Sequence, residues 1–323
     1  MKATAALRPF IVTLLAVAAC GQAKSDSASG AAADTMAARA ARLQEALAES
    51  DSGAEAAVLA RWLLPRELDE ISGLAVTADG RLLTHNDQDG VVWEIDYRRG
   101  VLVKRFQLGK QPIKGDFEGI AIANDRIFMI SSNGKLYEFR EGKDGERVNF
   151  NVYDTRLGSE CEFEGVAFDP NLSSLLLACK NVQGTNDSLV IYRWKLHSGD
   201  SERLSRLALP IANVMGSNNW KGLHPSDITI DPLSGNYVLI AARERALIEI
   251  TATGDPISAR GLSAQHVQAE GVAITREGIL IVSDESGGKD TRASARRPAA
   301  AVSLYRWNED GDGDGGGDGD GLL

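Results

Sequence analysis

Histidine and cysteine are scarce in this chain of 323 residues, which contains four histidines and three cysteines. None of the cysteines or histidines belongs to the cluster of acids described below, which argues against zinc or copper there. The chain also lacks a Gly-x-Ser-x-Gly elbow, a Gly-rich phosphate loop with Lys and a His-Glu-x-x-His motif. These absences exclude the commonest hydrolase, nucleotide-binding and zinc-protease signatures, and they leave oxygen ligands as the main metal chemistry available.

Long apolar runs are missing too, apart from residues 9–19. That run is too short to span a bilayer, and it follows Lys2 and Arg8, so it predicts a signal peptide over residues 1–19. The peptide ends in VAACG, a lipobox whose thiol, that of Cys20, would be diacylated. The alternative is an ordinary small-residue cleavage site that happens to be followed by a cysteine.

The residues after Cys20 are Gly and Gln rather than Asp, which predicts sorting to the outer membrane. We therefore expect a cell-envelope protein that a lipid anchors to the membrane, facing the periplasm or the exterior. Residues 20–56 are rich in Ala, Ser, Asp and Gly and predict a flexible tether, with one weak helix over 34–49.

Basic residues are fewer than acidic ones, so the formal net charge is −10. Six of the acids lie in residues 309–323, an Asp-Gly-rich tail that we predict to be disordered. The remainder stays acidic, which argues against a nucleic-acid partner.

Helix signals are weak between residues 57 and 308, but a phrase repeats there. Five similar units begin at Ser72, Glu118, Glu164, Ser226 and Glu270, with spacings of 46, 46, 62 and 44 residues. Each head is followed by Gly or Asp, an aliphatic residue and further β-like runs, with turn residues between them.

Four strands in about 45 residues are typical of a propeller blade. The fifth unit lacks a fourth strand, and the orphan run at 57–65 would supply it and close the ring. The sequence thus predicts an all-β, five-bladed β-propeller over 57–308, with six blades as the alternative. Residues 211–223 account for the longest spacing and predict an inserted loop.

The small residues at the heads predict where the blades meet. Innermost strands have the least room, and Gly and Ala let them approach closely. The same pattern bears on Cys161 and Cys179, which either pair or remain two small buried residues. A tight turn at 169–174 sets Cys179 opposite Glu164, which favours the unpaired alternative.

The head residues predict a shared site, because the innermost strands begin at one mouth of the central channel. Crowded carboxylates repel one another unless a cation lies among them, and calcium accepts many oxygen ligands. The predicted calcium ligands are Glu118, Glu164, Glu270, Asp227 and Asp284. Residues two before the heads and at the second-strand ends add further acids, namely Glu70, Asp87, Asp116, Glu162 and Glu285.

A purely structural ring is the alternative to a calcium site. In that ring the carboxylates accept backbone N–H groups or pair with Lys180 and Arg243.

The phrases EISGLA, EGVAFDP, HPSDITIDP and QAEGVAI resemble the SdiA-regulated, YjiK-like family of bacterial envelope proteins. The resemblance covers roughly residues 57–307, and NHL-type and phytase-like propellers carry related phrases. It implies a five-bladed propeller with a calcium site and no particular reaction. The fourth head, Ser226-Asp227, departs from the Glu-Gly pattern.

These observations favour a non-catalytic binding or scaffold module whose ligand is a small molecule or an envelope protein. The alternative is a calcium-dependent esterase, lactonase or phytase-like phosphoesterase. In such an enzyme His85 and His224 are the candidate bases, because both are expected to lie near the mouth.

Overall fold

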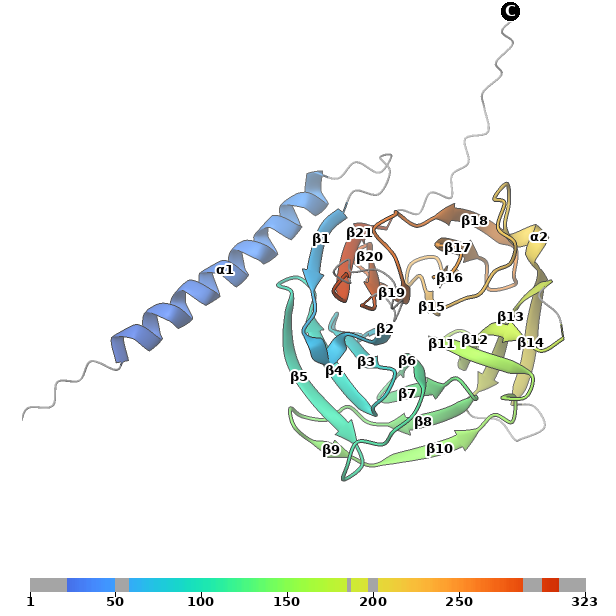
Figure 1. The fold of residues 1–323 in the computed structure, drawn as a ribbon, viewed down its shortest axis with the longest axis horizontal. Helices are drawn as coiled ribbons and strands as arrows, with labels where there is room; N and C mark the ends of the chain where they lie inside the picture. Colours follow the sequence, from blue (N-terminus) through green and yellow to red (C-terminus); the bar gives the residue numbers. More distant parts are fainter. Residues whose placement is uncertain (1–21, 50–57, 185–186, 197–202, 287–297, 308–323) are drawn as a thin grey trace, which may run out of the picture.

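Five antiparallel sheets radiate from one central axis in the computed structural model, and they form a five-bladed β-propeller (Figure 1). The five-bladed prediction is therefore confirmed, and the six-bladed alternative is wrong. The structure describes residues 22–49, 58–184, 187–196, 203–286 and 298–307, with the backbone alone for 22–34. The predicted signal peptide, Cys20 and the acidic tail lie outside the described residues.

Each blade runs from an innermost strand at the axis to an outer strand at the rim. The innermost strands are β2 (Ile71–Val76), β6 (Phe117–Ala123), β11 (Cys161–Asp169), β15 (Asp227–Ile230) and β19 (Ala269–Ile274). The second strands are β3 (Leu82–Asn86), β7 (Arg126–Ser131), β12 (Ser174–Val182), β16 (Tyr237–Ala241) and β20 (Ile279–Asp284).

The outer half of each blade carries the aromatic and β-branched runs. The third strands are β4 (Val91–Asp96), β8 (Lys135–Phe139), β13 (Ser188–Lys195), β17 (Ala246–Ile250) and β21 (Ala301–Arg306). The outer strands are β5 (Val101–Leu108), β10 (Phe150–Asp154), β14 (Leu204–Pro210), β18 (Pro256–Gly261) and β1 (Val58–Leu63). Blade one gains a short fifth strand, β9 (Arg147–Val148), which pairs parallel to β5.

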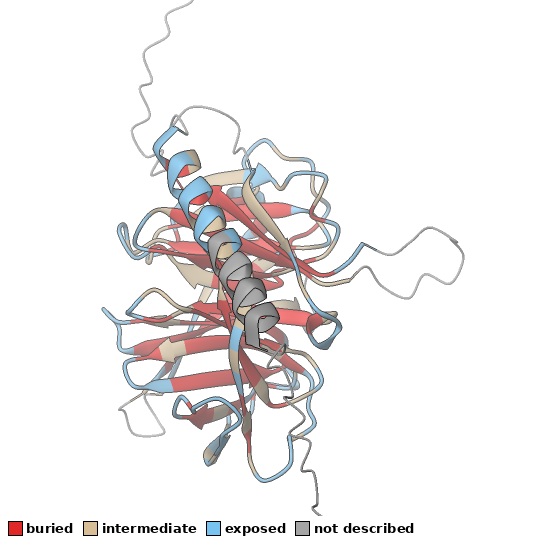
Figure 2. Ribbon diagram, turned by 90° about the vertical axis from the view of Figure 1, so that its left-hand side faces the viewer, coloured by how far each residue is buried: buried red, intermediate tan, exposed pale blue. Residues whose placement is uncertain are grey.

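The ring closes as predicted, because the N-terminal strand β1 pairs antiparallel with β21 and completes blade five. Five apolar clusters lie between successive blades, so each blade buries both faces (Figure 2). The predicted inserted loop contains the short helix α2 (Ile211–Val214) and no strand among its described residues. A 3₁₀ turn, η1 (Arg66–Leu68), links β1 to blade one.

The helix before the propeller, α1 (Gln22–Glu49), is longer than the predicted helix over 34–49. Its last turns dock on the propeller, because Leu43 and Leu47 join the apolar cluster between blades five and one. The Arg306 guanidinium donates to the Leu47 carbonyl at 2.6 Å. The C-terminal end of the helix therefore lies beside β1, and the rest of the helix extends away from the sheets (Figure 1).

Glycine at the heads lets the innermost strands touch through their backbones. A Cβ added to Gly73 would lie 2.8 Å from the Gly119 Cα, and one added to Gly119 would lie 2.7 Å from the Val166 N. The same holds at Gly165, where the nearest atom would be the Asp227 Cα at 2.8 Å. Contacts of that length are too short for any side chain, so glycine is required there.

We predict that Gly119→Ala destabilises the propeller by about 1–3 kcal/mol, because the new methyl group meets backbone atoms that cannot rotate away. Gly261→Ala is the matched control, since the nearest atom to its added Cβ lies at 4.0 Å. Urea unfolding of the two variants measures the difference. Equal free energies of unfolding would contradict the close-packed ring.

Candidate functional site

The carboxylates of three heads lie within electrostatic range of one another at one end of the channel. Glu118 of blade two is close enough to Glu164 of blade three and Glu270 of blade five for their charges to raise its pKa. Five further acids surround them and act on one another in the same way. These five are Glu70, Asp87, Asp116, Glu162 and Glu285. We call the eight acids together the acidic mouth.

Burial and mutual repulsion raise the pKa of five of these acids. Burial is the largest cause at each, and it raises the pKa of Glu118 to about 9 and that of Glu270 to about 8. The pKa of Glu164 and of Glu285 rises to about 7, and that of Asp87 to about 6. The acidic mouth thus holds protons at neutral pH that ordinary carboxyl groups would have released.

Lys180 is the cation that these carboxylates share. Its Nζ lies 2.8 Å from the Glu164 Oε1, and the Glu164 side chain is 6% exposed. Although burial acts to lower the pKa of Lys180, the neighbouring Glu164, Glu270 and Glu162 raise it overall. The charged ammonium group therefore stabilises the acidic mouth from within, as the structural-ring alternative expects.

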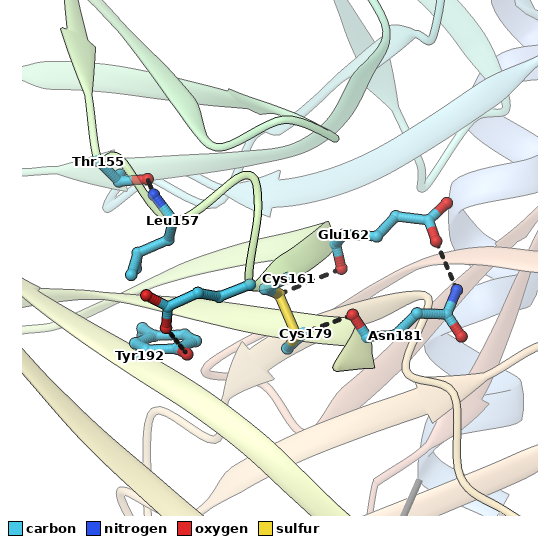
Figure 3. The surroundings of a disulfide bond; sticks show 8 residues. Thr155, Leu157, Cys161, Glu162, Cys179, Asn181 and Tyr192 are labelled. Atoms are coloured by element: carbon cyan, nitrogen blue, oxygen red, sulfur yellow. Dashed lines mark hydrogen bonds between the residues drawn. A yellow bond between two sulfur atoms is a disulfide. The ribbon is translucent and has the colours of Figure 1, made fainter. Parts of the chain in front are cut away.

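A disulfide joins Cys161 and Cys179 beside this ion pair, so the prediction that favoured unpaired cysteines is wrong (Figure 3). The turn sets Phe168 opposite Leu175 as expected, but two register shifts follow on either side of Phe163. They place Phe163, not Glu164, opposite Cys179 and bring the cysteine Cα atoms to 5.7 Å. A β-bulge thus turns both cysteines to one face.

Asp227 does not present its carboxylate to the acidic mouth in the way that the sequence suggested. The side chain is buried, and it accepts N–H groups from Ile228 and Val272, both at 2.8 Å, and from Leu74. Burial raises its pKa, whereas these N–H groups act to lower it. Asp227 occupies the glycine position of its head and joins blades four, five and one across the axis.

Asp284 also turns away from the predicted cluster. Its Oδ2 lies 2.8 Å from the His266 Nδ1, and the other ring nitrogen of His266 bonds to the Tyr305 hydroxyl. All three side chains are buried within blade five. The next residue, Glu285, joins the acidic mouth instead, since neighbouring residues of an extended strand face opposite sides.

The two candidate bases have different surroundings. His85 is fully buried, and burial lowers its pKa to about 4. Its Nδ1 lies 2.9 Å from the Asn86 carbonyl oxygen, and the side chain is closed off from solvent. His224 is partly exposed, with Nδ1 2.8 Å from the Glu244 Oε1 and Nε2 3.1 Å from Arg243. The sequence analysis missed Glu244, which follows the second strand of blade four.

The acidic mouth suits a hard cation in its chemistry, because every ligand it offers is oxygen. Among the described residues, no three acidic, histidine or cysteine side chains already stand close enough together to hold a metal ion. Binding would thus require carboxylate side chains to rotate inward. No helix in the described part of the chain is long and apolar enough to cross a membrane.

We predict that stability falls as pH rises from about 4.5 to 9. The folded protein keeps protons on Glu164, Glu270 and Glu118 that the unfolded chain has released above its ordinary pKa of 4.5. The native state binds more protons, so the free energy of unfolding decreases with pH. His85 acts oppositely, but only between pH 4 and 6.5.

Melting temperature against pH, without added metal, measures this slope. Glu118→Gln with Glu270→Gln removes two of the titrating groups, and the double variant should melt higher than the wild type at pH 9. If the melting temperature of the variant fell with pH as steeply as that of the wild type, these carboxyl groups would not be the cause of the pH dependence.

The fold also occurs in solved structures of low sequence identity. The aldose sugar dehydrogenase of Streptomyces coelicolor aligns with a TM-score of 0.52 and 14% identity, over 79% of this chain and 99% of that chain. The glutaminyl cyclase of Myxococcus xanthus aligns with a TM-score of 0.50 and 11% identity, over 78% and 96%. At such identities the likeness shows the fold alone.

Sequence comparison gives the family. No curated protein matches the chain. The model of the family described as SdiA-regulated, by contrast, matches residues 56–287. That span is well over half of the sequence and includes all five heads, so this protein belongs to the SdiA-regulated family.

Proposed function

We propose that this protein is a lipid-anchored propeller of the cell envelope whose acidic mouth binds a divalent cation. Calcium is the preferred cation, and the bound cation in turn binds an oxygen-rich ligand. The observation that carries the proposal is the raised pKa of Glu118, Glu270 and Glu164 around a single lysine. A buried cluster with more carboxyl groups than it can ionise gains free energy when a cation enters.

The ligands for calcium would come from Glu118, Glu164 and Glu270, with Glu285 and Asp87 at the edge of the acidic mouth. Asp227 and Asp284 were in the predicted set, and we leave them out because both are already hydrogen-bonded elsewhere. Calcium tolerates irregular oxygen cages, which suits carboxylates from different blades. When bound, it would bridge the blades and offer open positions to acceptor groups of a ligand.

A binding module fits this arrangement better than a hydrolase. A calcium-dependent hydrolase needs a base beside the cation to activate water. His85 is buried, and His224 is held between Glu244 and Arg243 in blade four. The proposed role is therefore to hold the propeller at a membrane surface and to present the cation to a small molecule or an envelope protein.

The disulfide supports a location in the envelope. Disulfides persist in oxidising compartments such as the periplasm and are rare in the cytosol. Cys161 and Cys179 form one within blade three.

Calcium at about 100 times its Kd should raise the free energy of unfolding by ~2.7 kcal/mol, and a chelator should reverse the change. Melting curves with calcium and with chelator measure it. Glu118→Gln with Glu270→Gln should abolish the response. Glu277→Gln is the control, because Glu277 pairs with Arg98 at the opposite end of blade five. A full response in the double variant would exclude the acidic mouth as the site.

Cys20→Ser should move the protein from the membrane fraction to the soluble fraction of fractionated cells, because lipid chains and not a spanning helix would hold it. The wild-type chain in the same cells is the control, and its N-terminal peptide should carry acyl mass. A variant that still sediments with membranes would overturn the lipid anchor and leave the cation proposal untouched.

A further inference from the structure

The channel has a second site at the end opposite the acidic mouth. A cavity of 180 Å³ lies there, lined by residues of all five innermost strands. Each blade contributes one large apolar residue four positions after its head, namely Val76, Ile122, Phe168, Ile230 and Ile274. The two ends of one channel thus differ in chemistry, since carboxylates gather at one and apolar side chains at the other.

Close contacts between the innermost strands separate the two ends. Backbone contacts at Gly73, Gly119 and Gly165 close the space around the axis, and the Asp227 carboxylate reaches across to Val272 and Leu74. A molecule in the cavity would therefore not touch the acidic mouth.

One cation stands at the rim of the cavity. Arg276 lines it and is exposed, and no carboxylate of the described residues forms an ion pair with Arg276. The adjacent Glu277 is engaged by Arg98 at 2.5 Å and does not neutralise it. A guanidinium that pairs with no carboxylate of the described residues and borders a cavity with apolar side chains suits the carboxylate of an amphipathic ligand.

The cavity also offers polar groups of the backbone. Each innermost strand is hydrogen-bonded to a neighbour on one side only, so the groups along its other edge face the channel. Small-molecule sites typically combine an apolar wall with a few such polar groups.

Size limits the ligand. An apolar cavity of about 150 Å³ accepts a molecule as large as benzene. We propose that the cavity binds a small monocarboxylate whose apolar body is about the size of a benzene ring or a six-carbon chain. The carboxylate lies against Arg276, and the body packs on the apolar residues from the five blades. This site is independent of the cation proposed for the acidic mouth.

Isothermal titration calorimetry of the full chain with hexanoate and with benzoate tests the proposal. Both should bind, whereas acetate and the neutral hexanamide should bind more weakly. Arg276→Gln should weaken hexanoate on the order of tenfold or more, because a charge-assisted hydrogen bond is lost. Ala78→Trp should block binding, since Ala78 lines the cavity, is small and is exposed at its rim.

Arg140→Gln is the matched control, because this arginine is 72% exposed and pairs with Asp125 in blade two. It should leave hexanoate affinity unchanged. No heat from either acid, equal binding of hexanamide, or equal weakening by the Arg140 and Arg276 variants would overturn the proposal. Affinity that is unchanged in Ala78→Trp would also overturn it, by placing the ligand elsewhere.

Discussion

The structure depends on the contact between neighbouring innermost strands at the axis. Three successive heads bring glycine against the backbone of the next blade, and the fourth replaces glycine by Asp227. That aspartate fills the place where a further glycine contact would lie and accepts N–H groups from two other blades. A buried carboxylate is costly unless it is fully hydrogen-bonded, and the three N–H groups meet that requirement. The pairing of β1 with β21 closes the ring at the rim, whereas the glycine contacts and the hydrogen bonds of Asp227 hold the blades together at the axis.

The acidic mouth is a consequence of this packing. Because the innermost strands all begin at the same end, head glutamates that are 46 residues or more apart in sequence become neighbours. Their desolvation follows from the narrow channel, and their raised pKa values follow from both. Blade three departs from the other blades at this point. A β-bulge at Phe163 shifts its register, and the neighbouring Glu164 forms an ion pair with Lys180. The result is a cluster that carries fewer negative charges than its composition implies.

The two ends of the channel make the propeller an asymmetric binding module. One end offers oxygen ligands for a hard cation, and the other offers a cavity that combines apolar side chains with polar groups and one arginine at its rim. Position along the strand explains the contrast, because a head residue and the residue four positions later share one strand face but lie at opposite ends of the channel. The helix α1 docks on the outside of blade five and leaves both ends of the channel uncovered in the described part of the chain (Figure 1).

Much of this arrangement follows from the repeat alone. The heads, their spacing and the orphan strand predict the blade number, the closure of the ring, the small residues at the axis and the gathering of Glu118, Glu164 and Glu270. These features depend only on periodicity, and periodicity survives folding because every blade obeys the same geometry.

Only the tertiary structure decided the features that break the repeat. A bulge at Phe163 changed the register and paired the cysteines, although the turn at 169–174 was predicted correctly. His85 is fully buried, Asp284 is hydrogen-bonded to His266, and Asp227 took a backbone-binding role that the other head positions lack. A one-residue shift reverses the face of a strand residue, and no local pattern marks where such shifts occur. The sequence by itself therefore determined the ring of blades, and three-dimensional packing decided which acids and histidines reach the channel.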